Sequence, residues 1–91
     1  MFNIYPEDFP KEQYEQNMKW HPHISHRRIV NPESVEAIEY RVEKFSSTIT
    51  NYYVDIMFRG KLNDCNFWFQ EENEAINLFE TLVKRLEDSK K

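Results

Sequence analysis

The chain has 91 residues, of which 40% are hydrophobic, 15% aromatic and 31% charged, and its formal net charge is −4. A chain of this size buries roughly 60–65% of its unfolded surface, so a core is expected without disulfides or a metal. The mixed charge excludes a disordered chain, and the acidic balance argues against a generic DNA-binding protein, which is usually basic.

Cysteine content and hydropathy predict a cytoplasmic protein. Cys65 is the only cysteine, so no internal disulfide can form, as suits a reducing compartment. The first ten residues, MFNIYPEDFP, lack the basic region and apolar run of a signal peptide. No segment approaches the roughly 20 apolar residues that span a bilayer, so no membrane contact is expected. With one glycine and no internal repeat, residues 1–91 are expected to form a single domain.

The N-terminal third predicts a short helix followed by a polar connection. Pro10 suits the first turn of a helix, and Tyr14 and Met18 stand four residues apart on one helical face. We therefore expect a helix at about 10–19 and, after the connection, a short strand at 26–30.

The segment NPESVEAIEYRVEKF, residues 31–45, fits two structures. The Asn-Pro pair at its start is typical of a helix start, and its apolar residues fit a helical stripe. Ile38, Tyr40 and Val42 also alternate with charged residues, as in a strand with one buried face. We favour a turn at NPES and a strand at about 36–45, with the helix as the alternative.

The next segment reads as a hairpin. Apolar and polar residues alternate over 52–59 and again over 65–70, which is typical of two strands. Gly60, Asn63 and Asp64, which tolerate the backbone angles of a turn, lie between these runs.

Apolar residues recur at three- and four-residue spacing near the C-terminus, which predicts an amphipathic helix at about 71–88. They are Ala75, Ile76, Leu78, Phe79, Leu82, Val83 and Leu86. The predicted fold class is thus α+β in two layers. It has a short N-terminal helix, a three- to four-stranded antiparallel meander and a long C-terminal amphipathic helix packed on one sheet face.

Strand alternation divides the sheet residues between two faces. The residues expected to meet the C-terminal helix are Tyr52, Val54, Ile56, Phe58, Phe67 and Phe69. The opposite face carries Tyr53, Met57 and Trp68, with Asp55 and Arg59 beside them. Trp, Tyr, Met and Arg are enriched at protein interfaces. Two interpretations stand. The N-terminal helix covers Trp68 against Tyr14 or Met18, or the face contacts a partner or a second copy.

Residues 19–28, KWHPHISHRR, hold all three histidines. The spacing H-x-H-x-x-H from His21 to His26 matches none of the zinc signatures, so we expect no metal and no cofactor. The segment also forms a basic patch that suits a phosphate backbone or an acidic protein surface. Its candidate contact residues are Lys19, His26, Arg27 and Arg28.

No motif identifies a catalytic site. One glycine cannot build a phosphate-binding loop, and no nucleophile–base set is evident, so we expect the protein not to be an enzyme. Compact acidic domains of this kind are typical of inhibitors that phages and other mobile elements carry. The leading hypothesis is therefore a small binding protein that docks on a protein partner and regulates or inhibits a host enzyme. A homodimer is the alternative occupant of the Trp68 face.

The second hypothesis is a nucleic-acid-binding module. It would use Lys19, Arg27 and Arg28 for phosphates and the aromatic sheet face for stacking on bases. Salt separates the two hypotheses, because phosphate contacts weaken steeply with salt whereas an apolar interface does so much less.

Overall fold

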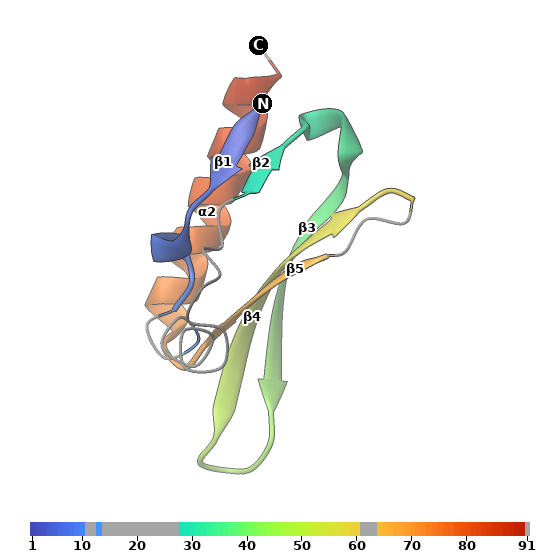
Figure 1. Cartoon of the computed structure of the whole chain (residues 1–91). Helices are drawn as coiled ribbons and strands as arrows, with labels where there is room; N and C mark the ends of the chain where they lie inside the picture. The colour runs from blue at the N-terminus through green and yellow to red at the C-terminus, as the bar shows by residue number, and fades with distance from the viewer. Residues whose placement is uncertain (11–12, 14–27, 61–63, 91) are drawn as a thin grey trace.

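A computed structural model describes residues 1–10, 13, 28–60 and 64–90. Within these ranges the chain forms an α+β fold, in which a three-stranded antiparallel sheet packs against one long C-terminal helix (Figure 1). The elements in chain order are β1 (Phe2–Ile4), η1 (Pro6–Asp8), β2 (Arg28–Val30), η2 (Pro32–Ser34), β3 (Val35–Lys44), β4 (Thr50–Phe58), β5 (Cys65–Phe69) and α2 (Glu72–Ser89).

The segment that fitted both a helix and a strand is a turn followed by a strand. Pro32–Ser34 form the short 3₁₀ helix η2, and the Asn31 side chain caps it by accepting a hydrogen bond from the backbone N–H of Glu33. β3 follows over Val35–Lys44. The predicted turn and strand are confirmed, and the helical alternative is wrong. The reason is cross-strand pairing: Ile38 lies opposite Ile56, which a helix could not achieve.

The sheet has the order β3-β4-β5, with the two predicted hairpin strands as β4 and β5. Ser46 shapes the β3–β4 turn, where its hydroxyl oxygen accepts hydrogen bonds from the N–H groups of Thr48 and Ile49. Gly60 has a φ of 76°, the left-handed conformation that favours glycine in a turn. Asp64 closes this second turn because its Oδ1 accepts a hydrogen bond from the N–H of Phe58.

Helix α2 confirms the predicted C-terminal helix. It spans Glu72–Ser89, and the buried residues on its inner face are Ala75, Leu78 and Leu82. Phe79 lies at the side of this face, with its ring centroid 6.2 Å from that of Tyr40 on β3. The helix therefore packs against one face of the sheet, as its apolar stripe predicts.

The N-terminal prediction needs two corrections. β2 does not extend the meander. It pairs antiparallel with β1, placing Phe2 opposite Val30, so β1 and β2 form a separate two-stranded sheet. The described residues contain no N-terminal α-helix as an element: Pro6–Asp8 form the 3₁₀ turn η1, and Gln13 is the one described residue of 11–19, in helical conformation. Most of the range 10–19 lies outside the described residues, as do Tyr14 and Met18.

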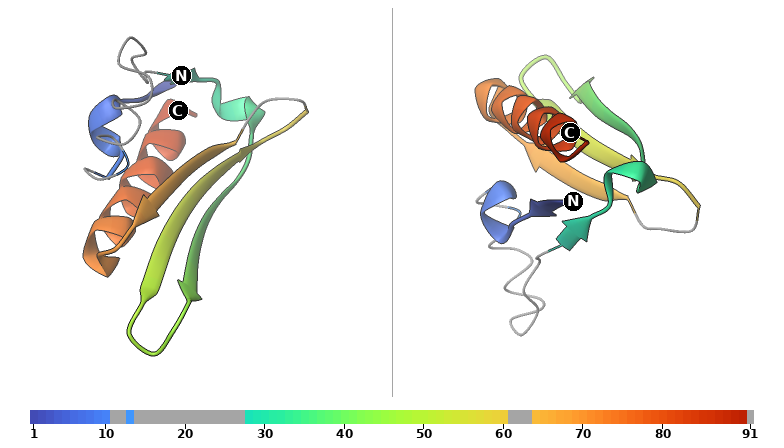
Figure 2. Two further views of the ribbon diagram at one scale, coloured as in Figure 1. Left: turned by 60° about the horizontal axis from the view of Figure 1, so that its bottom comes forward. Right: turned by 90° about the horizontal axis from the view of Figure 1, so that it is seen from above.

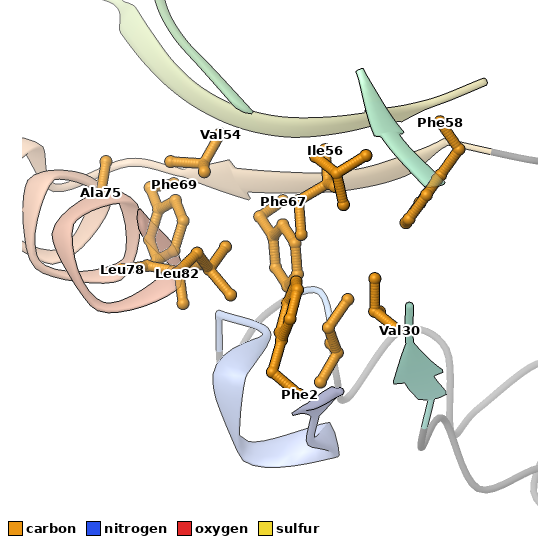
Figure 3. Close-up of a cluster of buried hydrophobic side chains, with 12 residues drawn as sticks. Phe2, Val30, Val54, Ile56, Phe58, Phe67, Phe69, Ala75, Leu78 and Leu82 are labelled. Atoms are coloured by element: carbon orange, nitrogen blue, oxygen red, sulfur yellow. The ribbon is translucent and has the colours of Figure 1, made fainter. Parts of the chain in front are cut away.

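The core lies between the meander, helix α2 and the two-stranded sheet. Figure 3 shows the sheet residues Val54, Ile56 and Phe67 pointing to the same side. On that side, Leu78 and Leu82 approach from α2, and Phe2 and Val30 approach from the two-stranded sheet (Figure 3). The helix and the small sheet thus share one face of the meander. The predicted inner face is confirmed as buried except for Tyr52, which is half-buried.

A candidate binding surface on the outer face of the sheet

The face of the meander opposite the core carries an aromatic and charged row. Trp68 on β5 lies opposite Tyr53 on β4, and Tyr53 lies opposite Arg41 on β3. The guanidinium carbon of Arg41 is 4.6 Å from the centroid of the Tyr53 ring, a cation–π contact. We call this side the outer face; its residues are Ala37, Glu39, Arg41, Tyr53, Asp55, Met57, Asn66 and Trp68.

A second row runs beside the first. Asp55 lies opposite Glu39 on β3 and opposite Asn66 on β5. Asp55 is only 8% exposed, and its Oδ2 lies 3.6 Å from Nη2 of Arg41. Its Oδ1 accepts no hydrogen bond within the described ranges. A buried carboxylate oxygen without a donor therefore lies at the centre of the outer face.

The environment of Asp55 raises the pKa of its carboxyl group. Burial is the largest cause, since it penalises the charged form. The carboxylates of Glu39 and Asp64 add to the rise, and the Arg41 guanidinium opposes it.

Three of the predicted contact residues share the outer face. Trp68, Tyr53 and Met57 are half-buried, and Met57 lies one row beyond Asp55, opposite Ala37. Arg59 follows the end of β4; its side chain is exposed, and its backbone N–H donates to the Ser34 carbonyl at 2.8 Å. The structure thus places Trp68, Tyr53 and Met57 on one side of the sheet, whereas Arg59 lies beyond the end of β4.

The side chain of Gln13 occupies the free edge of β5. Its Nε2 donates to the Asn66 carbonyl at 2.9 Å, and its Oε1 accepts from the Trp68 N–H at 3.0 Å. The Gln13 side-chain amide therefore makes the two hydrogen bonds that a neighbouring strand would make to β5 at this point. This pairing fixes the backbone beside Trp68 and satisfies an edge that would otherwise template pairing with another chain.

The predicted basic patch is only partly described. Lys19, His26 and Arg27 lie outside the described residues, as do the other two histidines. Arg28 lies on β2, where its guanidinium carbon is 4.2 Å from the centroid of the Phe58 ring and its Nη1 donates to the Cys65 Sγ at 3.2 Å. Arg28 thus makes contacts within the protein on the core side of the sheet, away from Trp68.

Cys65 has the environment of an inert thiol. Burial is the largest cause that raises its pKa, and Asp64 adds to the rise, whereas Arg28 lowers it through charge and through a hydrogen bond. A raised pKa keeps the thiol protonated, and the thiolate is the reactive form. In the described part of the chain, no three His, Cys, Asp or Glu residues are grouped closely enough to hold a metal ion.

An open groove lies between η1 and the first half of α2. Pro6–Pro10 line one side, and Leu78 and Thr81 lie on the other. Asp8 belongs to this wall and is held by Arg85, whose two terminal nitrogens bond its carboxylate at 2.7 and 3.1 Å. The bidentate pair ties η1 to the helix, so Asp8 has a structural role.

No family model, curated protein or solved structure matches the chain. Among the described residues, no helix combines the length and the hydropathy that crossing a bilayer requires.

Sequence reasoning missed two members of the site, namely Gln13 and Arg41, whereas it placed Asp55 on this face without a role. The Arg41–Tyr53 pairing could have been found by counting, because a turn centred on residue 47 places residues 41 and 53 opposite each other. Nothing local signals the hydrogen bonds of Gln13, since its partners are more than fifty residues away.

Proposed function

We propose that the protein is a non-enzymatic binding module that docks on a protein partner through the outer face of its sheet and inhibits or regulates that partner. Small inhibitors of host enzymes carried by phages and other mobile elements are the class that it fits best. The row formed by Trp68, Tyr53 and Arg41 carries the proposal, because tryptophan, tyrosine and arginine contribute most of the binding energy at protein interfaces.

The geometry of this row supports docking. The three side chains stand on adjacent strands, and the Arg41 guanidinium stacks on the Tyr53 ring, so little side-chain freedom remains to be lost on binding. Asp55 beside them is buried together with its donor-free Oδ1, so the contact surface is the aromatic row itself.

Nucleic-acid binding has less support. Asp55 and Glu39 lie in the middle of the outer face, where they would repel phosphates. Arg28, the described member of the predicted basic patch, is stacked on Phe58 on the core side of the sheet. A stacking platform for bases would also need basic side chains around it, and Arg41 is itself close to Asp55.

The first test is affinity capture from a lysate of the source organism, followed by calorimetry with the captured protein in purified form. We expect Trp68→Ala to weaken binding by about 2 kcal/mol or more, the loss typical of a hot-spot tryptophan. Ile29→Ala is the matched control, because Ile29 is 64% exposed on β2, and it should leave affinity unchanged.

Thermal melts of the same variants complete the test. The proposal expects Trp68→Ala to keep most of its stability. A variant that binds like the wild type but melts at a clearly lower temperature would instead place Trp68 in the core of the monomer. Capture that nuclease treatment abolishes would favour nucleic acid.

A further inference from the structure

β3 is an edge strand, and no strand within the described residues pairs with its outer side. The N–H of Phe45 donates to the Ile49 carbonyl at 3.0 Å, which sets the hydrogen-bonding phase of the β3–β4 ladder. Backbone groups alternate in direction along a strand. From residue 37 to residue 43, odd-numbered residues therefore bond to β4. Ile38, Tyr40 and Val42 direct their N–H and C=O groups to the free edge.

We propose that β3 pairs with β3 of a second copy of this chain, antiparallel about a two-fold axis at Tyr40. In this register Ile38 lies opposite Val42 of the second copy on the core side, and Glu39 lies opposite Arg41 on the outer face. Symmetry repeats each pair, so the interface contains two apolar pairs and two pairs of opposite charge. The paired outward groups all belong to even-numbered residues, as the hydrogen-bonding phase requires.

The neighbouring registers are disfavoured by charge. An axis at Glu39 places this residue opposite itself, and an axis at Arg41 does the same for the arginine and also sets Glu39 opposite Glu43. Like charges directly opposite each other destabilise a strand pair. A slip by one residue would pair even-numbered residues of one copy with odd-numbered residues of the other. The odd-numbered residues already bond to β4, so no hydrogen-bonded ladder could form. Charges on an edge strand usually discourage pairing with another chain. Here like charges meet in the two neighbouring registers, whereas opposite charges meet in the proposed one.

The shape of the molecule fits this pairing. The end of the β3–β4 hairpin extends beyond helix α2 in two directions of view (Figures 1 and 2). Val42, two residues before the end of β3, is 47% exposed although it belongs to the core side of the strand. Ile38 of the second copy would cover it. The bulge between Val35 and Ala37 ends regular pairing, so the ladder covers residues 37–43.

The assembled dimer would hold one continuous six-stranded sheet. The two-fold axis is perpendicular to the sheet, and a rotation about it does not exchange the two sides of the sheet. Both outer faces therefore lie on the same side. The two Trp68–Tyr53–Arg41 rows would form one extended, symmetric surface. The inference is independent of what that surface binds.

Sedimentation velocity of the full chain over a micromolar concentration series tests the inference. We expect a dimer that Glu39→Arg and Arg41→Glu each weaken by about tenfold or more, since each change makes two attractive pairs repulsive. The double variant Glu39→Arg/Arg41→Glu should restore the dimer, because the pairs re-form with exchanged signs. Lys84→Glu, at an exposed position of α2, is the control and should have no effect.

A cross-linking experiment tests the register itself in a Cys65→Ser background. Glu39→Cys chains mixed with Arg41→Cys chains should form a disulfide under mild oxidation. Residues in a non-hydrogen-bonded pair have Cα atoms about 4.5 Å apart, within the range that a disulfide accepts. Neither chain alone should cross-link. Two results would overturn the proposal: a monomer at every concentration, or a dimer whose affinity does not change when the charges are reversed.

Discussion

Asp55 stands on the middle strand of the sheet, with Glu39 and Asn66 on either side of it. Two effects compete at its carboxyl group. Shielding from water and the nearby carboxylates favour the neutral acid, whereas Arg41 favours the ion. The Arg41 side chain is 52% exposed, and its nearest nitrogen is 3.6 Å away, so solvent screens its attraction. The raised pKa shows that shielding and repulsion prevail.

A prediction about stability and pH follows from the upward shift of the Asp55 pKa. A carboxyl group whose pKa is higher in the folded state destabilises the fold increasingly as pH rises from its unfolded value, near 3.8, through the folded value. Asp55→Asn should therefore stabilise the protein at pH 7, because the amide carries no charge for burial to penalise. The gain should vanish in acid, where Asp55 is protonated in both states.

Urea unfolding at a series of pH values measures this effect. Glu80→Gln, an exposed carboxylate on α2, serves as the control and should change stability little at any pH. If Asp55→Asn is less stable than the wild type at pH 7, the ion pair with Arg41 outweighs the cost of shielding.

The same residues mark how far sequence reasoning reaches at the candidate site. Trp68 was assigned to the side opposite Phe67 and Phe69 by alternation alone, and the structure places it there. The cation–π contact of Arg41 and the edge hydrogen bonds of Gln13 were not predicted. Alternation gives the face of a residue, but only the pairing register gives its neighbours across strands.

At the scale of elements, α2 was predictable because its signal is local. Its apolar residues repeat with the period of a helix. Ala75, Leu78 and Leu82 of this stripe are buried, and Phe79 and Leu86 pack partly buried against the core. β3 was ambiguous for the opposite reason. Its sequence fits two periods, and the pairing with β4 that decides between them lies outside the segment.

Leu82 tests the packing of α2. It is fully buried, so Leu82→Ala should cost about 2–5 kcal/mol, a large part of the stability of so small a domain. Thr81→Ala changes the adjacent, exposed residue of the same helix and should stay within about 0.5 kcal/mol. Chemical unfolding of both variants makes the comparison. Equal effects would mean that the helix does not dock on the sheet through this stripe.

At the scale of the whole molecule, the sequence predicted a two-layer fold but not how the inner layer is shared. One helix was expected to cover the sheet. The structure divides this role between α2 and the β1–β2 pair, with Phe9 also stacked on Phe67 at a ring-centroid distance of 4.5 Å. β1 has three residues and too little length to show a period, and its partner β2 is more than twenty residues away. Neither strand could be paired from local pattern.

The chain's first strand is therefore a part of the core, and its contribution can be measured within the small sheet itself. Ile4 on β1 is 1% exposed, whereas Ile29 on β2 is 64% exposed. Ile4→Ala should destabilise the protein by about 2–5 kcal/mol, because it leaves a cavity beneath the meander. Ile29→Ala removes the same atoms from water-exposed surface and should cost less than about 0.5 kcal/mol. Similar melting temperatures for the two variants would show that the β1–β2 pair lies against the sheet without stabilising it, and α2 alone would then account for the core.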